Sequence, residues 1–306
     1  MDIKHWANLF AGLTYHAYCI WLFTFSDLKT IIFPQSLFGL LTALSQTKTT
    51  PISTLDIAYR VPLVFGWVYA NLLPFEINNQ RQPEAIQEDK LNKPWRTMPS
   101  GKWTSNQAFF GMWFFYMSAG LLSWSIGVLP WSLCLMLLGS WYNNFGGSDV
   151  NPVVRNLINA LGYTCFGVGA LEVALNVPLN INPGEIIEPK NLRLLGWVSI
   201  VALIIMTTVQ TQDMEDQMGD IQRGRRSLPV EIGDGPARWI TAIFMAIWAP
   251  VCPVFWQSSW LGYAITMPWA LLVAWRTLMF RGVEEDKQTF RLWNIWIMSI
   301  YLLPLL

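Results

Sequence analysis

Charged side chains are scarce in this sequence. Asp, Glu, Lys and Arg make up 13% of the 306 residues, and the formal net charge is zero. The chain therefore lacks the excess of basic residues that is typical of nucleic-acid-binding proteins, and we expect no nucleic-acid partner. Hydrophobic residues reach 53%, and the mean hydropathy is +0.33. This composition excludes an ordinary soluble domain and indicates a membrane protein.

Cysteine and histidine are also rare, with four cysteines and two histidines. The cysteines lie in or beside apolar stretches and show neither a paired framework nor metal-ligand spacing, so we interpret them as small buried residues. The histidines lie near the start of the chain, where packed or interfacial positions are more common than catalytic ones. Neither residue type indicates a catalytic or metal site. These residues are Cys19, Cys134, Cys165, Cys252, His5 and His16.

Long apolar stretches are abundant. A helix that crosses a bilayer needs roughly 20 apolar residues, and nine stretches approach this length. They cover residues 16–42, 56–78, 105–126, 127–145, 154–176, 192–211, 236–256, 258–280 and 288–306. The sequence therefore predicts an all-α fold, a polytopic membrane bundle of about nine transmembrane helices. Because no linker or low-complexity segment divides the chain, we expect residues 1–306 to form a single domain.

Basic residues predict the orientation of this bundle. With nine spans, the face that carries the N-terminus holds fifteen of the twenty lysines and arginines, the opposite face holds four, and Lys29 lies within the first span. The positive-inside rule places the basic face in the cytosol. The N-terminus lacks the basic region and cleavage site of a secretory signal, so we expect the first span to be the anchor.

An acidic segment follows the sixth apolar stretch, at residues 210–230, QTQDMEDQMGDIQRGRRSLPV. On a helix, Asp213, Asp216 and Asp220 point within about 60° of one another, whereas Glu215 points away. Carboxylates on one stripe repel one another unless a cation lies among them, and hard oxygen ligands suit Mg²⁺, which also bridges to phosphates. A solvated loop of mixed charge is the alternative interpretation.

Basic residues follow these acids within two turns, and guanidinium groups hold phosphate oxygens well. They are Arg223, Arg225 and Arg226. The same order of acids and then bases occurs after the second apolar stretch, in NNQRQPEAIQEDKLNKPWRTMPSG, residues 78–101. There Lys93 and Arg96 follow the acids. Two such segments on one face of the membrane are what a metal-bound diphosphate requires, namely anions for Mg²⁺ and cations for the remaining phosphate charge.

Proline divides the segment at residues 78–101. Pro83 should end the preceding helix near Asn79 and begin a new, short one. In that short helix Glu84 and Glu88 are four residues apart and share a face, with Asp89 beside them. We expect these acids to lie at the cytosolic edge of the membrane, near those of residues 210–230.

Both segments resemble the UbiA superfamily of intramembrane prenyltransferases. Residues 213–229 are similar to its second motif, DxxDxxxDxxxGxxTxP, with Ser227 in place of threonine, and residues 91–101, LNKPWRTMPSG, resemble the NKPxRPxPSG segment that follows its first motif. The resemblance implies a nine-helix bundle around a central cavity. It also implies a diphosphate site that faces the cytosol and Mg²⁺-assisted ionisation of an isoprenoid diphosphate.

The first motif departs from the family form, NDxxDxxxD. One register places Gln80, Glu84 and Glu88 on it, as QxxxExxxE. With Asp89 beside them, the metal ligands on this side are expected among the three acids, and the sequence does not select two. The pairs NQ and ED together with NKPWR are similar to the fungal branch that contains membrane-bound sesquiterpene cyclases.

The resemblance implies two sets of site residues. The metal ligands would be Glu84, Glu88, Asp89, Asp213, Asp216 and Asp220, and all but Asp89 are also expected to be catalytic. The substrate contacts would be Asn79, Gln80, Lys93, Arg96, Arg155, Asn156, Arg223, Arg226 and Lys29. Helix capping explains Arg155 and Asn156 equally well, and neutralisation by Asp27 explains Lys29 equally well. Two glutamates are expected to tolerate replacement, Glu215 on the other helix face and Glu76 before the Pro83 break.

The function that we expect is Mg²⁺-dependent ionisation of farnesyl diphosphate and closure of the cation to a cyclic sesquiterpene. Some aromatic side chains are expected to line the cavity and stabilise the cation. The alternative enzyme is a prenyltransferase with an aromatic acceptor, which both motifs permit, and a transporter is the non-enzyme alternative. The expected partners are an isoprenoid diphosphate and the lipid bilayer, without an obligate protein partner.

Overall fold

The structure is a computed structural model that describes residues 3–46, 52–179 and 189–306. The regular elements in these ranges are all helices, which confirms the all-α fold. The long and short α-helices are α1 (Ile3–Thr24), α2 (Phe33–Gln46), α3 (Thr54–Gln80), α4 (Pro83–Asn92), α5 (Ser105–Ser125), α6 (Leu129–Asn144), α7 (Pro152–Leu175), α9 (Pro189–Thr208), α10 (Asp213–Arg223), α11 (Leu228–Ile232), α12 (Asp234–Trp256), α13 (Trp260–Met279) and α14 (Val283–Ile300).

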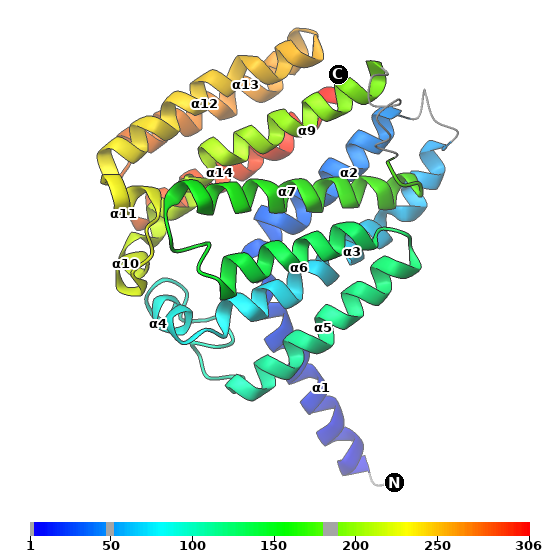
Figure 1. Cartoon of the computed structure of the whole chain (residues 1–306), viewed down its shortest axis with the longest axis vertical. Coiled ribbons are helices and arrows are strands. Elements are labelled where there is room, and N and C mark those ends of the chain that lie inside the picture. Colours follow the sequence, from blue (N-terminus) through cyan, green and yellow to red (C-terminus); the bar gives the residue numbers. More distant parts are fainter. Residues whose placement is uncertain (1–2, 47–51, 180–188) are drawn as a thin grey trace.

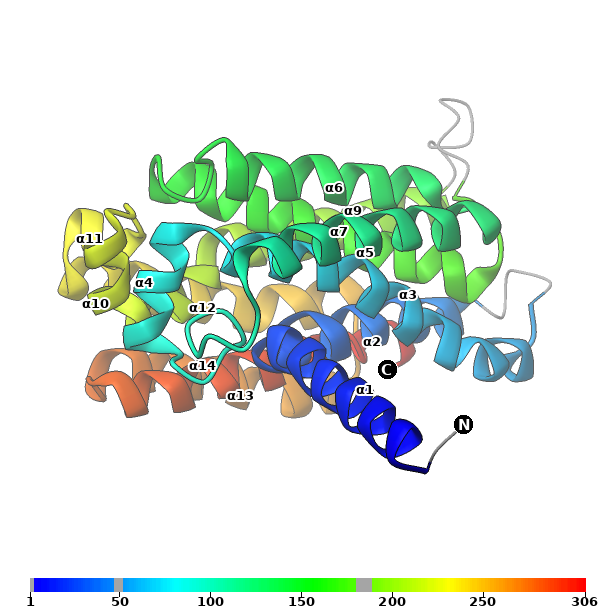
Figure 2. The same ribbon diagram turned by 90° about the horizontal axis from the view of Figure 1, so that it is seen from below.

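The long helices lie side by side, and the short helices lie at one end of the bundle (Figure 1). α7 is central, because α2, α3, α6 and α9 all contact it and most of its residues are buried. The short helices α4, α10 and α11 lie at the same end when the molecule is turned by 90° (Figure 2). α4 and α10 are in contact there. The fold therefore brings the two acidic segments together.

The first expected span, residues 16–42, is not a continuous helix. A 3₁₀ turn, η1 (Phe25–Asp27), and a π-helical turn, η2 (Leu28–Ile32), separate α1 from α2. π-Turns occur frequently at functional sites. Here the break falls on the two charged residues of the span, Asp27 and Lys29, and both line the cavity described below.

Both acidic segments form short helices with defined ends. α3 ends at Gln80 and α4 begins at Pro83, as the fixed φ of proline predicts. A 3₁₀ turn, η3 (Val209–Gln212), leads from α9 into α10. α10 ends at Gly224, whose φ of +78° is a left-handed conformation that glycine adopts without a steric penalty.

Four helical segments of the described ranges are long and apolar enough to cross a membrane: Ala11–Gln46, Pro152–Leu175, Asn191–Arg223 and Asp234–Trp256. The expected number of nine is not confirmed. The other expected spans fall on α3, α5, α6, α13 and α14. α6 has only 16 residues, and α14 has three acidic residues in its first turn. Because neighbouring helices cover part of each surface, helices of a bundle need not be apolar on every side.

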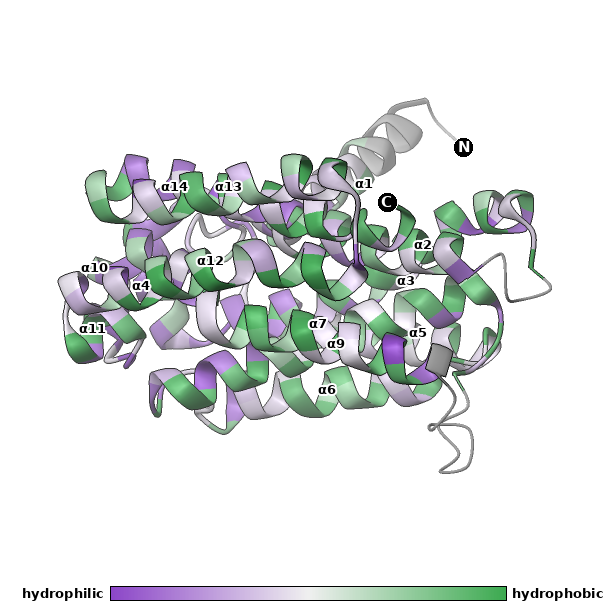
Figure 3. Ribbon diagram, turned by 90° about the horizontal axis from the view of Figure 1, so that it is seen from above, coloured by the Kyte–Doolittle hydropathy of each residue, from purple (hydrophilic) through white to green (hydrophobic). Residues whose placement is uncertain are grey.

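The surface has two characters. Hydrophilic residues are most frequent around α4, α10 and the start of α14, whereas the flanks of the long helices are largely hydrophobic (Figure 3). Large apolar side chains are exposed there, for example Phe110, Trp124 and Leu137 at 70%, 69% and 72%. An apolar surface of this kind suits a lipid environment.

Candidate active site

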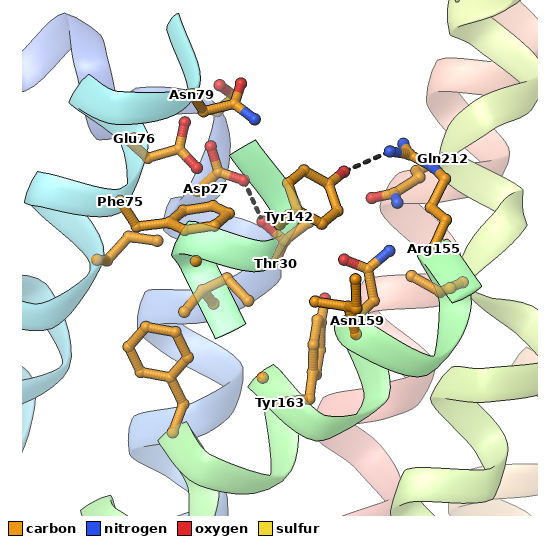
Figure 4. A pocket seen from close by; sticks show the side chains of 18 of the residues that line it. Asp27, Thr30, Phe75, Glu76, Asn79, Tyr142, Arg155, Asn159, Tyr163 and Gln212 are labelled. Atoms are coloured by element: carbon orange, nitrogen blue, oxygen red, sulfur yellow. Dashed lines mark hydrogen bonds between the residues drawn. The ribbon is translucent and has the colours of Figure 1, made fainter. Parts of the chain in front are cut away.

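A cavity of about 190 Å³ lies between α3, α6, α7 and η2, and its lining is divided by polarity (Figure 4). Charged and amide side chains line the part toward α4 and α10, which we call the charged end: Asp27, Lys29, Glu76, Asn79, Glu88, Lys93, Arg96, Arg155, Gln212, Glu215, Asp216 and Arg225. Mostly aliphatic and aromatic side chains line the remainder, which we call the apolar chamber: Ile31, Leu72, Phe75, Leu135, Leu138, Ile158, Tyr163, Phe166, Val209 and Phe290, with the amides of Asn71 and Asn159 among them.

Helix direction explains this division. On α7 the lining residues run from Arg155 at the charged end to Phe166 in the chamber, and on α3 they run from Asn79 to Leu72 and the neighbouring Asn71. From Arg155 to Phe166 the helix rises by about 16 Å, at 1.5 Å per residue, which gives the extent of the cavity along α7. The helices therefore carry polar residues where they meet α4 and α10, and apolar ones deeper in the bundle.

Asp213 and Asp216 each contact a basic residue that the sequence places in the site. Asp213 Oδ1 accepts a hydrogen bond from Arg155 Nη2 at 2.7 Å, and both side chains are almost completely buried. Asp216 Oδ2 accepts one from Lys93 Nζ at 2.7 Å. These two contacts connect α10 with α7 and with the segment that follows α4. Asp216 lines the cavity directly, whereas Asp213 lies behind Arg155.

Asp220 belongs to a cluster around Arg225. Arg225 donates to Asp220 at 3.1 Å, to Glu88 at 2.8 Å and to Asp149 at 3.1 Å. Ser227 donates to the other oxygen of Asp220 at 2.6 Å. Arg225 lines the cavity, yet the sequence analysis does not select it as a substrate contact. It follows the left-handed turn that ends α10, so helical periodicity gives no indication of its direction.

The two arginines near Arg225 in the sequence, Arg223 and Arg226, do not line the cavity. Arg223 donates to Glu88 at 2.9 Å and to Asp149 at 3.3 Å, next to the cavity. Arg226 is exposed and donates to Glu231 at 2.7 Å. The structure therefore does not bring the Arg226 side chain into the site, contrary to our expectation, because this side chain pairs with Glu231 of α11 at the surface. Asp149, in the α6–α7 connection, is a site residue that the sequence analysis did not identify.

The position of Glu215 also differs from our expectation that this side chain points away from the site. It lines the cavity beside Asp216, although one-face spacing on a helix predicts that it points away. Its Oε2 is buried without a hydrogen-bond partner. Glu215 and Asp216 are successive residues and point about 100° apart on a helix. The cavity is wide enough to contact both side chains. Asp213 and Asp220 do not line it, so the cavity meets a different stripe of α10 from the one predicted.

α4 contributes Glu88 and Asp89 to the site, but not Glu84. Glu88 lines the cavity and Asp89 is buried at its edge. Burial alone would raise the pKa of Glu88, but its two arginine partners outweigh this and hold the pKa below its ordinary value. Glu84, in the first turn of α4, is exposed. The expectation that Glu84 is a metal ligand is therefore not supported by its position.

Arg96 is surrounded by carboxylates. It donates to Asp89 at 3.1 Å and to Ser26 at 2.7 Å, and its guanidinium lies 3.7 Å from Asp27 and 3.9 Å from Glu76. Glu76 is 5% exposed and lines the cavity. Its position before Pro83 predicts that Glu76 lies outside the site, and the structure corrects this expectation. It lies one turn before Gln80 on the cavity face of α3, and this makes it a site residue.

The remaining predicted substrate contacts divide into two groups. Asn79 and Lys29 line the cavity, and Lys29 Nζ lies 5.0 Å from the centre of the Phe290 ring. Gln80 and Asn156 do not line it. Their amide nitrogens donate to backbone carbonyls of neighbouring segments at 2.8 and 3.1 Å, which indicates packing roles for both.

The carboxylates fit Mg²⁺ in their chemistry, although within the described ranges no three Asp, Glu, His or Cys side chains converge as a ready metal centre. The acids of the charged end are hard oxygen donors of the type that Mg²⁺ prefers. Two of these oxygens, Glu215 Oε2 and Asp27 Oδ2, are buried without a hydrogen-bond partner. Most of the other acids are paired with lysine or arginine, so metal binding at this site requires exchange of those pairs.

The cavity has a charged end that opens into an apolar chamber, and it lies within a bundle of apolar helices. This combination suits an amphiphilic anion. Residues 82–298 match the model of the UbiA prenyltransferase family. The chain belongs to this family of membrane proteins, which confirms the resemblance seen in the two acidic segments.

Two relatives are named as terpene synthases. The chain is 28% identical to somaliensene A/B synthase of Streptomyces somaliensis, over 90% of this chain and 88% of that protein. It is also 28% identical to fumagillin beta-trans-bergamotene synthase of Aspergillus fumigatus, over 79% of each chain. A solved UbiA homolog from Archaeoglobus fulgidus, bound to GPP and Mg²⁺, has the same fold, with a TM-score of 0.58, 14% identity, and coverage of 91% of this chain and 99% of that one.

Proposed function

We propose that this protein is a membrane-bound terpene cyclase that ionises farnesyl diphosphate and closes the isoprenoid chain to a cyclic sesquiterpene. The observation that carries this proposal is the continuity of one cavity from a charged end to an apolar chamber. The charged end suits a diphosphate, and the chamber suits an isoprenoid chain. The similarity to two relatives named as terpene synthases supports the same reading.

Mg²⁺ fits this proposal through the carboxylates of both motifs. The residues that would hold it are Asp216 and Glu88 of the cavity lining, together with Asp213, Asp220 and Asp89 once their arginine partners turn to the diphosphate. When bound, Mg²⁺ supplies positive charge beside the diphosphate oxygens of the leaving group. Glu84 is not included because its side chain is exposed.

Basic residues of the charged end would bind the diphosphate. Lys93, Arg96, Arg155 and Arg225 line the cavity, and each is paired with at least one carboxylate. A diphosphate that enters the site exchanges these pairs for contacts with phosphate oxygens. Because the cations are already in position, they stabilise the negative charge that develops as the C–O bond breaks, without further reorganisation.

The apolar chamber would control the resulting cation. Cleavage of the C–O bond leaves the bonding electrons on the diphosphate and a positive charge on the allylic carbons. The π electrons of a distal double bond form the new C–C bond, and loss of a proton to the released diphosphate gives a neutral cyclic hydrocarbon. The rings of Phe75, Phe166 and Phe290 line the chamber, and each contact with a desolvated cation contributes about 2 kcal/mol. The apolar wall excludes water, which would capture the cation as an alcohol.

Prenyl transfer to an aromatic acceptor is the second candidate function, and the family to which the chain belongs favours it. The two candidates share the ionisation step and differ in what meets the cation. For both, we propose that the charged end faces the cytosol, and that the membrane of a fungal protein is the endoplasmic reticulum.

The test is to incubate the purified protein in detergent with Mg²⁺ and, separately, with geranyl, farnesyl and geranylgeranyl diphosphate. Extracted products are separated by gas chromatography and identified by mass spectrometry. A cyclic C15 hydrocarbon from farnesyl diphosphate, lost in Asp216→Asn, is the expected result. No hydrocarbon from any substrate, together with a prenylated adduct once a phenolic acceptor is added, would establish the transferase instead.

A further inference from the structure

Two polar side chains face the apolar part of the cavity. Asn159 and Tyr163 are one helical turn apart on α7, and both line the cavity (Figure 4). With Arg155 they form a stripe at four-residue spacing on one face of the helix. The stripe begins at the charged end and continues into the chamber, along the path that an isoprenoid chain bound at Arg155 would follow.

Neither side chain has a hydrogen-bond partner among the residues that the structure describes. Asn159 Nδ2 is buried and donates no hydrogen bond, and Asn159 Oδ1, the atom that could face a cation, accepts none in the described part of the chain. Tyr163 is only 7% exposed, and its hydroxyl makes no hydrogen bond in the described part of the chain. Asn71, which lines the cavity from α3, differs in this respect, because its amide oxygen accepts a hydrogen bond from Ser132 at 2.5 Å.

Unpaired polar groups in apolar surroundings destabilise a fold. Native proteins seldom contain them without a functional or structural reason. The amide oxygen of Asn159 and the hydroxyl oxygen of Tyr163 carry partial negative charge, and in a water-poor chamber such dipoles interact strongly with a nearby positive charge. They are thus suited to a ligand that becomes cationic during the reaction.

We propose that Asn159 and Tyr163 determine where the positive charge settles on the isoprenoid chain, and hence which ring forms. This inference rests on the proposed cyclase function. Asn159, one turn from Arg155, would act on carbons near the diphosphate, and Tyr163, one turn deeper, on carbons farther along the chain. Both are specificity-determining residues, because each would touch the cation without taking part in C–O cleavage.

The test uses Asn159→Leu and Tyr163→Phe, which preserve side-chain size and remove the polar group. The full-length protein is incubated with farnesyl diphosphate and Mg²⁺, and both diphosphate release and the product ratio are measured. We expect the ratio of the main cyclic product to the other terpenes to change by about fivefold or more in each variant, which corresponds to about 1 kcal/mol at 1.4 kcal/mol per factor of ten. Diphosphate release should change less than this ratio.

Tyr301→Phe is the matched control, because Tyr301 is also buried but does not line the cavity. It should keep the wild-type product ratio. If the wild type forms a cyclic product and Asn159→Leu and Tyr163→Phe both keep its ratio, the inference is wrong and the cyclase function stands. If the wild type forms no cyclic product, both proposals fail. If Asn159→Leu does not elute as folded protein on size exclusion, Tyr163→Phe, which lacks a single oxygen atom, decides alone.

Discussion

At the scale of single residues, two successive arginines after α10 have opposite environments. Arg225 is 5% exposed and contacts three carboxylates, whereas the side chain of Arg226 is 56% exposed and pairs with Glu231. Surface ion pairs contribute little to stability. A buried cation among several carboxylates, in contrast, cannot be removed without leaving negative charge uncompensated.

We therefore predict that Arg225→Gln lowers kcat/KM by about 100-fold or more, the usual effect of removing one preorganised charge from an active site. Arg226→Gln should remain within about twofold of the wild type, because its ion pair is solvent-exposed. Steady-state diphosphate release measures both, and circular dichroism checks that each variant is folded. Equal losses in the two variants would contradict the placement of Arg225 at the charged end.

A second pair of variants compares two glutamates. Glu76→Gln should reduce kcat/KM by about tenfold, because a carboxyl group 3.9 Å from the Arg96 guanidinium is replaced by an amide that cannot carry a negative charge. Glu84→Gln should have no measurable effect, since this side chain is exposed. The same assay of diphosphate release applies. If Glu84→Gln is the more damaging change, the metal ligands follow the QxxxExxxE register and Glu84 belongs to the site.

The sequence could predict part of this site. Asp213, Asp216 and Asp220 follow one motif with regular spacing, and the structure brings all three into contact with basic residues of the site. Glu76 and Asp149 belong to no motif. They become site residues because α3 is rotated with Glu76 toward the cavity and because the α6–α7 connection packs against the end of α10, and neither feature is encoded locally.

At the scale of elements, the contact between α4 and α10 brings the two motifs together. Gly219 makes a close approach possible, since a Cβ there would lie 2.2 Å from Asn92 Nδ2. Asn92 in turn donates to the backbone carbonyl of Asp216 at 3.2 Å. This close approach and the hydrogen bond of Asn92 add to the contact of Arg223 with Glu88, which also joins the two helices that carry the acids.

We predict that Gly219→Ala displaces the Asn92 side chain, breaks its hydrogen bond to Asp216 and destabilises the protein by about 1–3 kcal/mol. The variant should show a lower apparent Tm in detergent and weaker activity. Gly235→Ala is the control, because a Cβ at that position meets nothing within 4 Å. A Tm for Gly219→Ala equal to that of the control would show that α4 and α10 do not pack as described.

Helix ends illustrate which elements the sequence predicts. Pro83 has a fixed φ and no amide donor, so the end of α3 and the start of α4 could be predicted. The break at η2 could not, because the residues around Lys29 form part of a continuous apolar stretch. A π-turn adds one residue to a helical turn without a sequence signature of its own, and tertiary packing decides where it forms.

At the scale of the whole molecule, composition and apolar stretches predict an all-α membrane protein, and the structure confirms the helical fold. They do not predict which rings face the cavity. Of the 18 tryptophans in the sequence, none lines the cavity within the described ranges, where phenylalanine and tyrosine do so instead. The rotation of each helix about its axis depends on contacts with several other helices, and single-helix periodicity does not contain that information.

Metal removal tests the charged end as a whole. We predict that exhaustive chelation with EDTA abolishes diphosphate release and that added Mg²⁺ restores it, because hard carboxylate oxygens bind Mg²⁺ and the site offers no soft ligands in its described lining. Ca²⁺, which is larger and takes more ligands, should restore less. Undiminished turnover after chelation would falsify the assignment of the carboxylates to a metal-bound diphosphate.

The stoichiometry of products tests the proposed cyclase function most directly. Purified protein is given farnesyl diphosphate and Mg²⁺ without any acceptor, and the diphosphate released and the cyclic hydrocarbon formed are quantified in the same sample. If the apolar chamber holds the cation until a ring closes, the two amounts are equal throughout the reaction. A protein that releases little diphosphate until a phenolic acceptor is added, or that releases it with farnesol as the main product, is not the cyclase described here.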